Sequence, residues 1–394
     1  MDERKSNNPL PSDMFSMKRA PILWVGSGIS KRYVEGFQTW DELLSSVAGK
    51  FGISPGMYAA IRMEASREVE DPKRSPDLVA MKTASKLSSR LISMISDGSI
   101  EPTDILSEND AELFLRGVDP IKLLVCASIR NVTFRKDMEI EIELFSRLRE
   151  SVPAVVTTNY DTVVEMLFGE EFKVFSDVDD YYGLDSMGVG EIYKIHGTVS
   201  KPRSIFLLEE DIKEYQHTRP VISSKIISLM CESPLLILGH SMDDSIIRDT
   251  IADILDCFSG GKAAEVSRNI VCVRYSDEDE VTMKGSMQIE SRGRFFQVQT
   301  IVTNELIPII EDASQYRRTL TVGQIRTFRR MMVDASLSRN PNQNHRLAFV
   351  GIEGIDDIDP ERTVIALTSR VYLDAAKSFT AFTNGFPERV TILT

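Results

Sequence analysis

The chain has 394 residues, of which 42% are hydrophobic, and at about 150 residues per domain this length predicts two or three units with ample core. A formal net charge of −13 argues against general affinity for nucleic acid, because that binding depends on Lys and Arg neutralising phosphates, although a local basic patch stays open. No apolar run approaches the roughly 20 residues of a membrane helix, and residues 1–17 lack a signal peptide's apolar centre, so we expect a cytoplasmic protein without membrane association.

The first elements in chain order are a polar tail, a strand and a block of helices. Residues 1–17 are rich in Asn, Pro and Ser and are expected to be a flexible tail. The apolar run 22–25 predicts a strand that leads into Gly26-Ser27-Gly28-Ile29-Ser30, and a helix opens at Trp40. Helical spacing then continues, and we place a helical insertion at about 45–150. It is compatible with a pocket wall, a scaffold or an interface.

From Ser151 onward, strands and helices alternate, which predicts a parallel sheet with crossover helices. The expected strands are 154–156, 191–193, 235–238, 269–274 and 295–302. The first three lead into the segments Thr157-Thr158-Asn159-Tyr160-Asp161, Lys194-Ile195-His196-Gly197 and Gly239-His240-Ser241-Met242-Asp243-Asp244. Because ligands bind at the carboxyl ends of parallel strands, these segments and the first glycine turn should converge on one site, for a nucleotide.

The remainder of the chain predicts a small α+β domain at 313–394. It contains a helical pattern at 323–337 and strand candidates at 347–352, 363–368 and 390–394. The terminal strand could pair with a neighbouring chain or complete its own domain. The predicted class is therefore α/β, with a Rossmann-like parallel sheet, a helical insertion and a small C-terminal α+β domain.

Together the ordered motifs Gly-x-Gly-Ile-Ser, Thr-x-Asn-x-Asp, His-Gly and Gly-x-Ser resemble the sirtuin-like NAD-binding domain, over roughly residues 20–310. More narrowly they resemble its bacterial branch in antiphage defence, which hydrolyses NAD. The resemblance implies that residues 18–312 bind NAD. Deacylase sirtuins hold a structural zinc with two C-x-x-C pairs between the last two motifs, but here that interval, Gly197 to Gly239, contains only Cys231. We therefore expect no zinc.

The resemblance also implies a set of cofactor-binding residues. These are Gly26, Ser27, Gly28, Ser30, Thr158, Gly239, Ser241 and Asp244. Glycines at 26 and 28 would let the backbone approach a pyrophosphate, although a tight turn without a ligand is the alternative. For Asp244 the alternative is a helix cap, and for Arg32 a surface position instead of a phosphate contact. Trp40 lies where the family places a loop over the nicotinamide.

The expected catalytic residues are Asn159, Asp161 and His196. In the family the matching Asn orders the nicotinamide ribose and a water, and the matching Asp bonds the nicotinamide carboxamide. Nicotinamide leaves from a cationic pyridinium, so the protein mainly has to stabilise an oxocarbenium-like centre and place a nucleophile. His196 is the candidate general base, since an imidazole pKa is ordinarily about 6.5. The alternatives are a helix cap for Asn159 and a structural role for His196.

The implied activity is that of an NAD+ glycohydrolase that releases nicotinamide and ADP-ribose and serves antiphage defence by depleting NAD. The alternatives are an NAD-dependent deacylase or ADP-ribosyl transferase, and a non-catalytic nucleotide-binding assembly subunit. We expect a homo-oligomer that a HerA-type ring ATPase activates through assembly, with 313–394 as the oligomerisation or partner-binding domain. A stripe formed by Arg326, Arg329 and Arg330 is either solvated or receives an acidic partner or nucleic acid.

Overall fold

The computed structural model describes most of the chain. The described residues are 15, 19–73, 75–181, 188–240, 242, 245–276, 283–291, 294–318, 320–327, 346–351, 363–368 and 390–392. They fall into two compact units, Met1–Arg317 and Arg318–Thr394. None of the helices in these ranges is long and apolar enough to cross a lipid bilayer.

The first unit is built on an eight-stranded sheet in the order β3-β4-β2-β1-β5-β6-β8-β7. Its strands are β1 (Ile22–Val25), β2 (Ala154–Thr157), β3 (Lys173–Phe175), β4 (Glu191–Lys194), β5 (Leu235–Leu238), β6 (Ile270–Tyr275), β7 (Met283–Ser291) and β8 (Arg294–Thr303). All neighbours pair in parallel except β7 and β8. The predicted α/β class with a Rossmann-like parallel sheet is confirmed, while β7 is not among the predicted strands.

The order of the strands creates a switch point at β1. The chain builds outward from β1 on one side through β2 and β4, and on the other side through β5 and β6. Strands β1, β2, β4 and β5 are buried along their whole length, as expected for a parallel sheet covered on both faces. Their carboxyl ends are therefore neighbours, in the crevice where open α/β sheets bind ligands.

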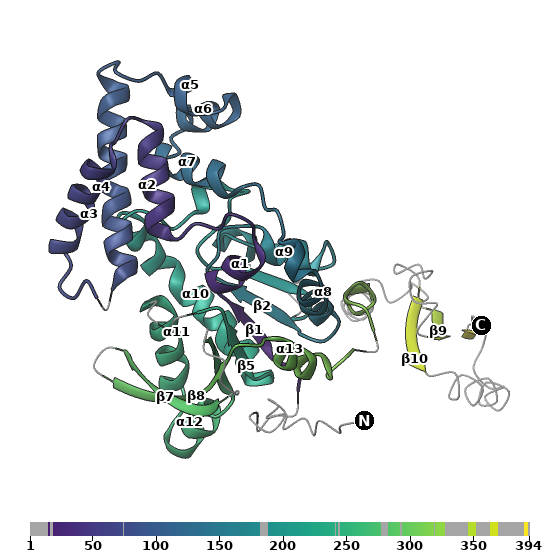
Figure 1. The fold of residues 1–394 in the computed structure, drawn as a ribbon. Coiled ribbons are helices and arrows are strands. Elements are labelled where there is room, and N and C mark those ends of the chain that lie inside the picture. Colours follow the sequence, from purple (N-terminus) through teal and green to yellow (C-terminus); the bar gives the residue numbers. More distant parts are fainter. Residues whose placement is uncertain are drawn as a thin grey trace, which may run out of the picture. The chain divides into compact units, whose positions relative to one another are not determined.

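A block of helices separates β1 from β2 in the chain (Figure 1). After α1 (Ser27–Tyr33) it comprises α2 (Trp40–Lys50), α3 (Pro55–Arg67), α4 (Pro76–Ser96), α5 (Pro102–Ile105), α6 (Glu108–Leu115), α7 (Pro120–Ile129) and α8 (Glu139–Arg147), with 3-10 turns at Lys136–Met138 and Leu148–Glu150. A capping box between Thr39 and Glu42 starts α2, and Asp119 caps α7 ahead of a proline. Their core also includes Tyr160, Ile205 and Leu207 of the α/β part.

The remaining helices cover the sheet. They are α9 (Val163–Phe168), α10 (Asp211–Glu232), α11 (Ser245–Asp256), α12 (Gly260–Ser267) and α13 (Ile307–Ser314), with 3-10 turns at Val178–Tyr181 and Pro202–Ser204. Helices α10 and α11 bury Ile226 and Ile247 against Trp24 and Ile237, in one hydrophobic cluster on one face of the sheet. Helix α8 contacts both α9 and α13, outside that cluster.

The second unit contains a parallel three-stranded sheet in the order β10-β9-β11. Its strands are β9 (Arg346–Gly351), β10 (Thr363–Thr368) and β11 (Val390–Ile392), close to the three predicted positions. Strand β11 pairs with β9 of its own unit and lies at the edge of the sheet. Residues 322–327 are helical, and the rest of the predicted helix, with Arg329 and Arg330, lies outside the described residues.

Candidate functional site

The four motif segments meet at the carboxyl edge of the sheet because β4, β2, β1 and β5 are consecutive in it. Backbone hydrogen bonds join the segments. The amide of Gly28 donates to the carbonyl of Gly239 at 2.9 Å, and the amide of Val199 donates to the carbonyl of Tyr160, also at 2.9 Å. The turn after β1 is thus tied to the turn after β5, and the segment after β4 to the segment after β2.

The glycine turns pack backbone against backbone. A Cβ added at Gly26 would lie 2.5 Å from the His240 ring, and one at Gly28 would lie 2.8 Å from Gly239 Cα. Gly239 itself has a φ of +72°, in the left-handed region that favours glycine. Close contact between the two turns therefore accounts for these glycines without a ligand. Ser27 is exposed at the first position of α1.

Ser30, Asn159 and Asp161 form one hydrogen-bonded cluster. The Ser30 hydroxyl donates to Asp161 Oδ2 at 2.8 Å, and the Asn159 amide nitrogen donates to Ser30 Oγ at 3.1 Å. Asp161 Oδ1 accepts from the Val163 amide at 3.0 Å, at the start of α9. This helix begins at Val163 with Thr162 as its N-cap residue, so the alternative that Asn159 caps a helix beginning at Tyr160 or Asp161 is wrong. Asn159 keeps an exposed fraction of 7%.

His196 lies near the aromatic rings of Tyr160 and Phe206, and Tyr160 in turn contacts Trp40. Its ring centroid is 5.2 Å from that of Phe206 and 6.4 Å from that of Tyr160, whose hydroxyl donates to the Phe206 carbonyl. Trp40 packs edge-on against Tyr160 at 5.3 Å and is 39% exposed, whereas His196 is 9% exposed. Trp40, Tyr160 and Phe206 thus form a wall of aromatic rings that includes two neighbours of His196 and reaches the surface at Trp40.

Burial makes His196 a neutral imidazole at physiological pH. It lowers the pKa of His196 to about 4, and the carboxylate of Asp77 in the first turn of α4 partly offsets this effect. The expectation of a pKa near 6.5 therefore needs correction. A neutral ring can accept a proton at pH 7, but as a weaker base than an exposed histidine. The helical block also contributes to the site's electrostatics through Asp77.

His240 is a second site histidine, and sequence reasoning gave it no role. Its Nε2 lies 3.4 Å from Thr158 Oγ1, and its ring covers Gly26. Burial lowers the pKa of His240, and His196 lowers it further. Two features of the sequence could have identified His240. The chain has only four histidines, and His240 lies in the turn that follows an apolar strand.

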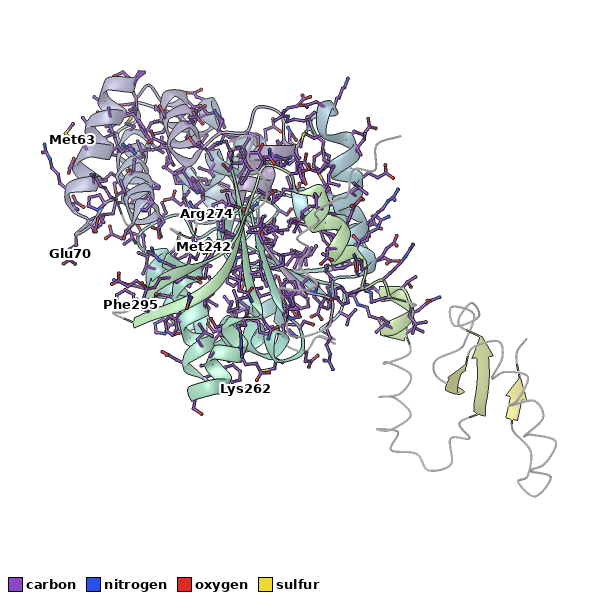
Figure 2. All side chains as sticks on the ribbon, turned by 60° about the horizontal axis from the view of Figure 1, so that its bottom comes forward. Met63, Glu70, Met242, Lys262, Arg274 and Phe295 are labelled. Carbon is purple, nitrogen blue, oxygen red and sulfur yellow. The ribbon has the colours of Figure 1, made fainter. Side chains whose placement is uncertain are left out.

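The turn after β5 continues with a left-handed residue. Met242 has a φ of 65°, and its side chain is buried in the core of the α/β unit (Figure 2), whereas Met63, Lys262 and Phe295 lie at the periphery. Non-glycine residues in this region are uncommon and often mark functional turns. Its neighbours Ser241 and Asp244, both predicted to bind the cofactor, lie outside the described residues.

Arg32 is bound within the protein. Its guanidinium Nε and Nη2 contact the two carboxylate oxygens of Glu141 at 2.5 Å and 2.8 Å, and the Tyr33 hydroxyl donates to the same carboxylate at 2.9 Å. The guanidinium also lies 4.8 Å from the centre of the Tyr275 ring. Arg32 therefore joins α1 to α8, which is neither of the two roles left open by the sequence.

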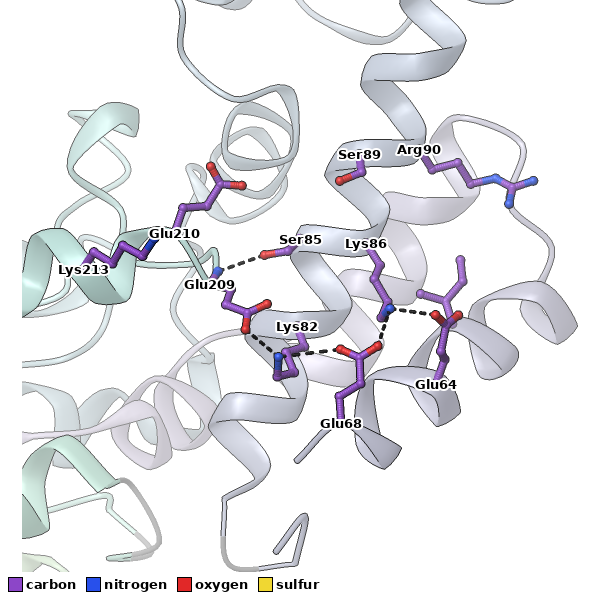
Figure 3. A pocket seen from close by; sticks show the side chains of 11 residues that line it. Glu64, Glu68, Lys82, Ser85, Lys86, Ser89, Arg90, Glu209, Glu210 and Lys213 are labelled. Atoms are coloured by element: carbon purple, nitrogen blue, oxygen red, sulfur yellow. Dashed lines mark hydrogen bonds and ion pairs between the residues drawn. The ribbon is translucent and has the colours of Figure 1, made fainter. Parts of the chain in front are cut away.

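A charged groove of about 700 Å³ lies between α3, α4 and the start of α10 (Figure 3), and none of its lining residues belongs to the four motifs. Lys82 pairs with Glu209 at 2.5 Å and with Glu68 at 3.6 Å, and Lys86 pairs with Glu64 and Glu68, both at 2.8 Å. Because these lysines and glutamates already pair with one another, we place the candidate site on the motif residues and not in this groove.

The described residues contain no group of three or more His, Cys, Asp or Glu side chains that could hold a metal ion. Cys126 and Cys272 are buried thiols, and Cys231 and Cys257 are exposed thiols. The expected absence of zinc stays a prediction, which metal analysis of the purified protein tests.

Residues 153–292 match the family model described as the SIR2-like domain. This span includes Asn159, Asp161, His196 and Gly239, and it excludes the first glycine turn. No curated protein matches the chain. The match and the Rossmann-like sheet together support a sirtuin-like domain, and such a domain indicates NAD-related activity.

Gly197 gives a stability prediction. Its φ is +84°, and an added Cβ would lie 2.1 Å from the carbonyl oxygen of Ser204. We expect Gly197→Ala to lower the free energy of unfolding by about 2–4 kcal/mol, from left-handed strain and overpacking together. The matched control is Gly52→Ala, because Gly52 has a φ of +82° with nothing within 4 Å. If denaturant unfolding gives the same decrease in unfolding free energy for both variants, the clash with the Ser204 carbonyl contributes nothing and this part of the prediction is refuted.

The lowered pKa of His196 gives a pH prediction. An unfolded histidine binds its proton near pH 6.5 and the folded one only near pH 4, so its contribution to stability is complete above pH 6.5 and is lost as pH falls toward 4. Between pH 7.5 and pH 5, wild type should lose about 2 kcal/mol more unfolding free energy than His196→Gln. Parallel pH dependences for the two proteins in denaturant titrations would contradict the burial argument.

Proposed function

We propose that the protein is an NAD+ glycohydrolase that cleaves NAD+ with water into nicotinamide and ADP-ribose. The observation that carries the proposal is the joint placement of the buried Asn159 amide and the neutral His196 imidazole after the adjacent strands β2 and β4 of a SIR2-like domain. Neither group bears a charge at pH 7. Both are suited to hold water and ribose hydroxyls next to a cationic leaving group.

The reaction needs little from the protein beyond placement and one proton acceptor. The bond between C1′ of the ribose and the pyridinium nitrogen breaks, its electron pair stays with nicotinamide, and a water oxygen bonds to C1′. The proton released by the water passes to His196 and then to solvent. Asn159 would hold the attacking water or the ribose, and Asp161 the carboxamide, as the resemblance implies. The wall formed by Trp40, Tyr160 and Phe206 would exclude bulk solvent.

The biological role follows from the same resemblance. We propose that the enzyme is an antiphage effector that depletes the cytoplasmic NAD pool after assembly as a homo-oligomer with a HerA-type ring ATPase. An NAD hydrolase without control would harm its own cell, which favours activation by assembly. The separate second unit, with β11 at a sheet edge, offers a surface for that assembly.

Product analysis tests the enzymatic proposal. Purified protein is incubated with NAD+, with and without candidate activators, and the products are separated by chromatography. Free ADP-ribose and nicotinamide in equal amounts, without any acyl or protein acceptor, support hydrolysis. Products that appear only with an acetylated peptide or an acceptor protein would favour the deacylase or transferase. Binding of NAD+ without turnover under every activating condition would favour the assembly subunit.

A further inference from the structure

The lysine of the Lys-x-His-Gly segment has no part in the reaction as described so far, although its side chain is completely buried. Lys194 is the last residue of β4, and its side chain has an exposed fraction of 0%. Lysine is almost never fully buried unless its ammonium group is paired. The contacts of this ammonium group therefore indicate its purpose.

The ammonium group of Lys194 contacts the segment that follows β2 at two positions. The ammonium group donates to the backbone carbonyl oxygen of Asp161 and lies 2.7 Å from Oε1 of Glu165 in α9. Lys194 is paired in register with Thr157, the last residue of β2. The side chain thus reaches from the end of one strand to the chain that leaves its neighbour, where Asn159 and Asp161 lie.

Asp161 is held through both its backbone and its side chain. Its carbonyl oxygen accepts from Lys194, while its carboxylate accepts from Ser30 Oγ at 2.8 Å and from the Val163 amide at 3.0 Å. The same Ser30 hydroxyl accepts the Asn159 amide at 3.1 Å. A displacement of the Asp161 backbone would therefore change the position of Ser30 relative to Asn159.

The ion pair alone is a poor explanation for a buried lysine. Burial raises the pKa of Glu165 in spite of the opposing effect of Lys194, so desolvation outweighs the attraction. The Oε2 atom of Glu165 has no hydrogen-bond partner in the described part of the chain. Buried ion pairs are often no more stabilising than apolar side chains of the same size. What distinguishes Lys194 is its hydrogen bond to the Asp161 carbonyl.

We propose that Lys194 is a positioning residue for NAD hydrolysis, whose ammonium group fixes the Asp161 backbone and thereby the placement of Asn159 and Asp161 relative to His196. The inference rests on the proposed function. Because His196 follows Lys194 by two residues, the end of one strand carries the proposed base and also holds the segment with the proposed water-binding amide. A displacement of about 1 Å in such a site can reduce turnover by about 10²-fold.

The test separates positioning from charge balance. Lys194→Met alone would leave Glu165 buried without a partner, and this variant can fail to fold. The test variant is therefore Lys194→Met/Glu165→Gln, which removes both charges and keeps similar side-chain volumes. The matched control is Lys122→Met/Asp211→Asn, because Lys122 and Asp211 form another mostly buried pair, 2.6 Å apart. Both double variants are made in the full chain.

Two measurements decide the outcome. In the test variant we expect kcat for nicotinamide release to fall by about 10–100-fold while KM stays within about three-fold of wild type. Amide hydrogen exchange in residues 158–163 should become at least about ten-fold faster, with little change in the denaturation midpoint. The control variant should keep wild-type kcat and wild-type exchange in this segment.

The inference is overturned if the test variant keeps wild-type exchange at 158–163 and wild-type kcat. It is also overturned if the test variant unfolds while the control variant folds, because Lys194 would then be needed for the stability of the folded state. If wild type releases no nicotinamide under any condition, the proposed function fails. The hydrogen-exchange measurement does not depend on turnover, so unchanged exchange in the test variant would still refute the proposal that Lys194 fixes the Asp161 backbone.

Discussion

Replacing His196 with alanine is expected to reduce the rate of NAD hydrolysis by about 10²–10⁴-fold, the usual contribution of a general base. The imidazole follows β4, is 9% exposed and is neutral at pH 7, so it can accept the proton of the attacking water. Nicotinamide release by the purified variant under activating conditions measures the effect. Circular dichroism and the denaturation midpoint establish that the variant is folded.

The matched control is His217→Ala. His217 is exposed on α10 and belongs to none of the four motifs, so its loss should leave the rate unchanged. If His196→Ala is folded and hydrolyses NAD at a rate close to that of wild type, His196 is not the base. His240, the other histidine at this site, would then be the next residue to test.

The pH dependence of the rate distinguishes a buried base from an exposed one. With a pKa of about 4, His196 stays deprotonated through the whole neutral range. As the pH is lowered, kcat/KM should therefore begin to decrease only well below pH 6.5. Because kcat/KM reports ionisation in the free protein, an acid limb near pH 6.5 would contradict the assignment of the buried His196 as the base.

The fold could be predicted from the sequence because its central strands carry a strong local signal. The runs 22–25, 154–156 and 235–238, in β1, β2 and β5, are short, apolar and followed by glycine or polar residues. Strand β7 carries a weaker signal, in which Met283, Gly285, Met287 and Ile289 alternate with polar residues and one position is glycine. Its antiparallel pairing with β8 supplies the stability that the local sequence lacks.

The site was predictable only as far as strand adjacency determines it. Residues placed after neighbouring parallel strands must meet, which brings Ser30, Asn159 and Asp161 together. The roles of His240 and Lys194 depend on how far their side chains reach across the strand ends, and sequence spacing does not give this. Burial of an imidazole, which lowers its pKa, is likewise a property of the packed structure.

The second large effect is expected for Asn159→Ala, which should reduce kcat by about 10²–10⁴-fold and change KM little, because the amide is proposed to place the water or ribose in the transition state. Nicotinamide release over a range of NAD concentrations measures both constants. The fold should survive, since Ser30 keeps its hydrogen bond to Asp161 and one lost hydrogen bond costs about 1 kcal/mol.

Asn269→Ala is the matched control for this variant. Asn269 is also a buried asparagine, and its amide donates to the Glu265 carbonyl at 3.0 Å, at the end of α12 and away from the four motifs. Its loss should lower stability by a similar amount and leave kcat unchanged. Equal kcat values in the two alanine variants would mean that Asn159 serves the fold through Ser30, and the proposed placement of water would then have to be assigned to another group.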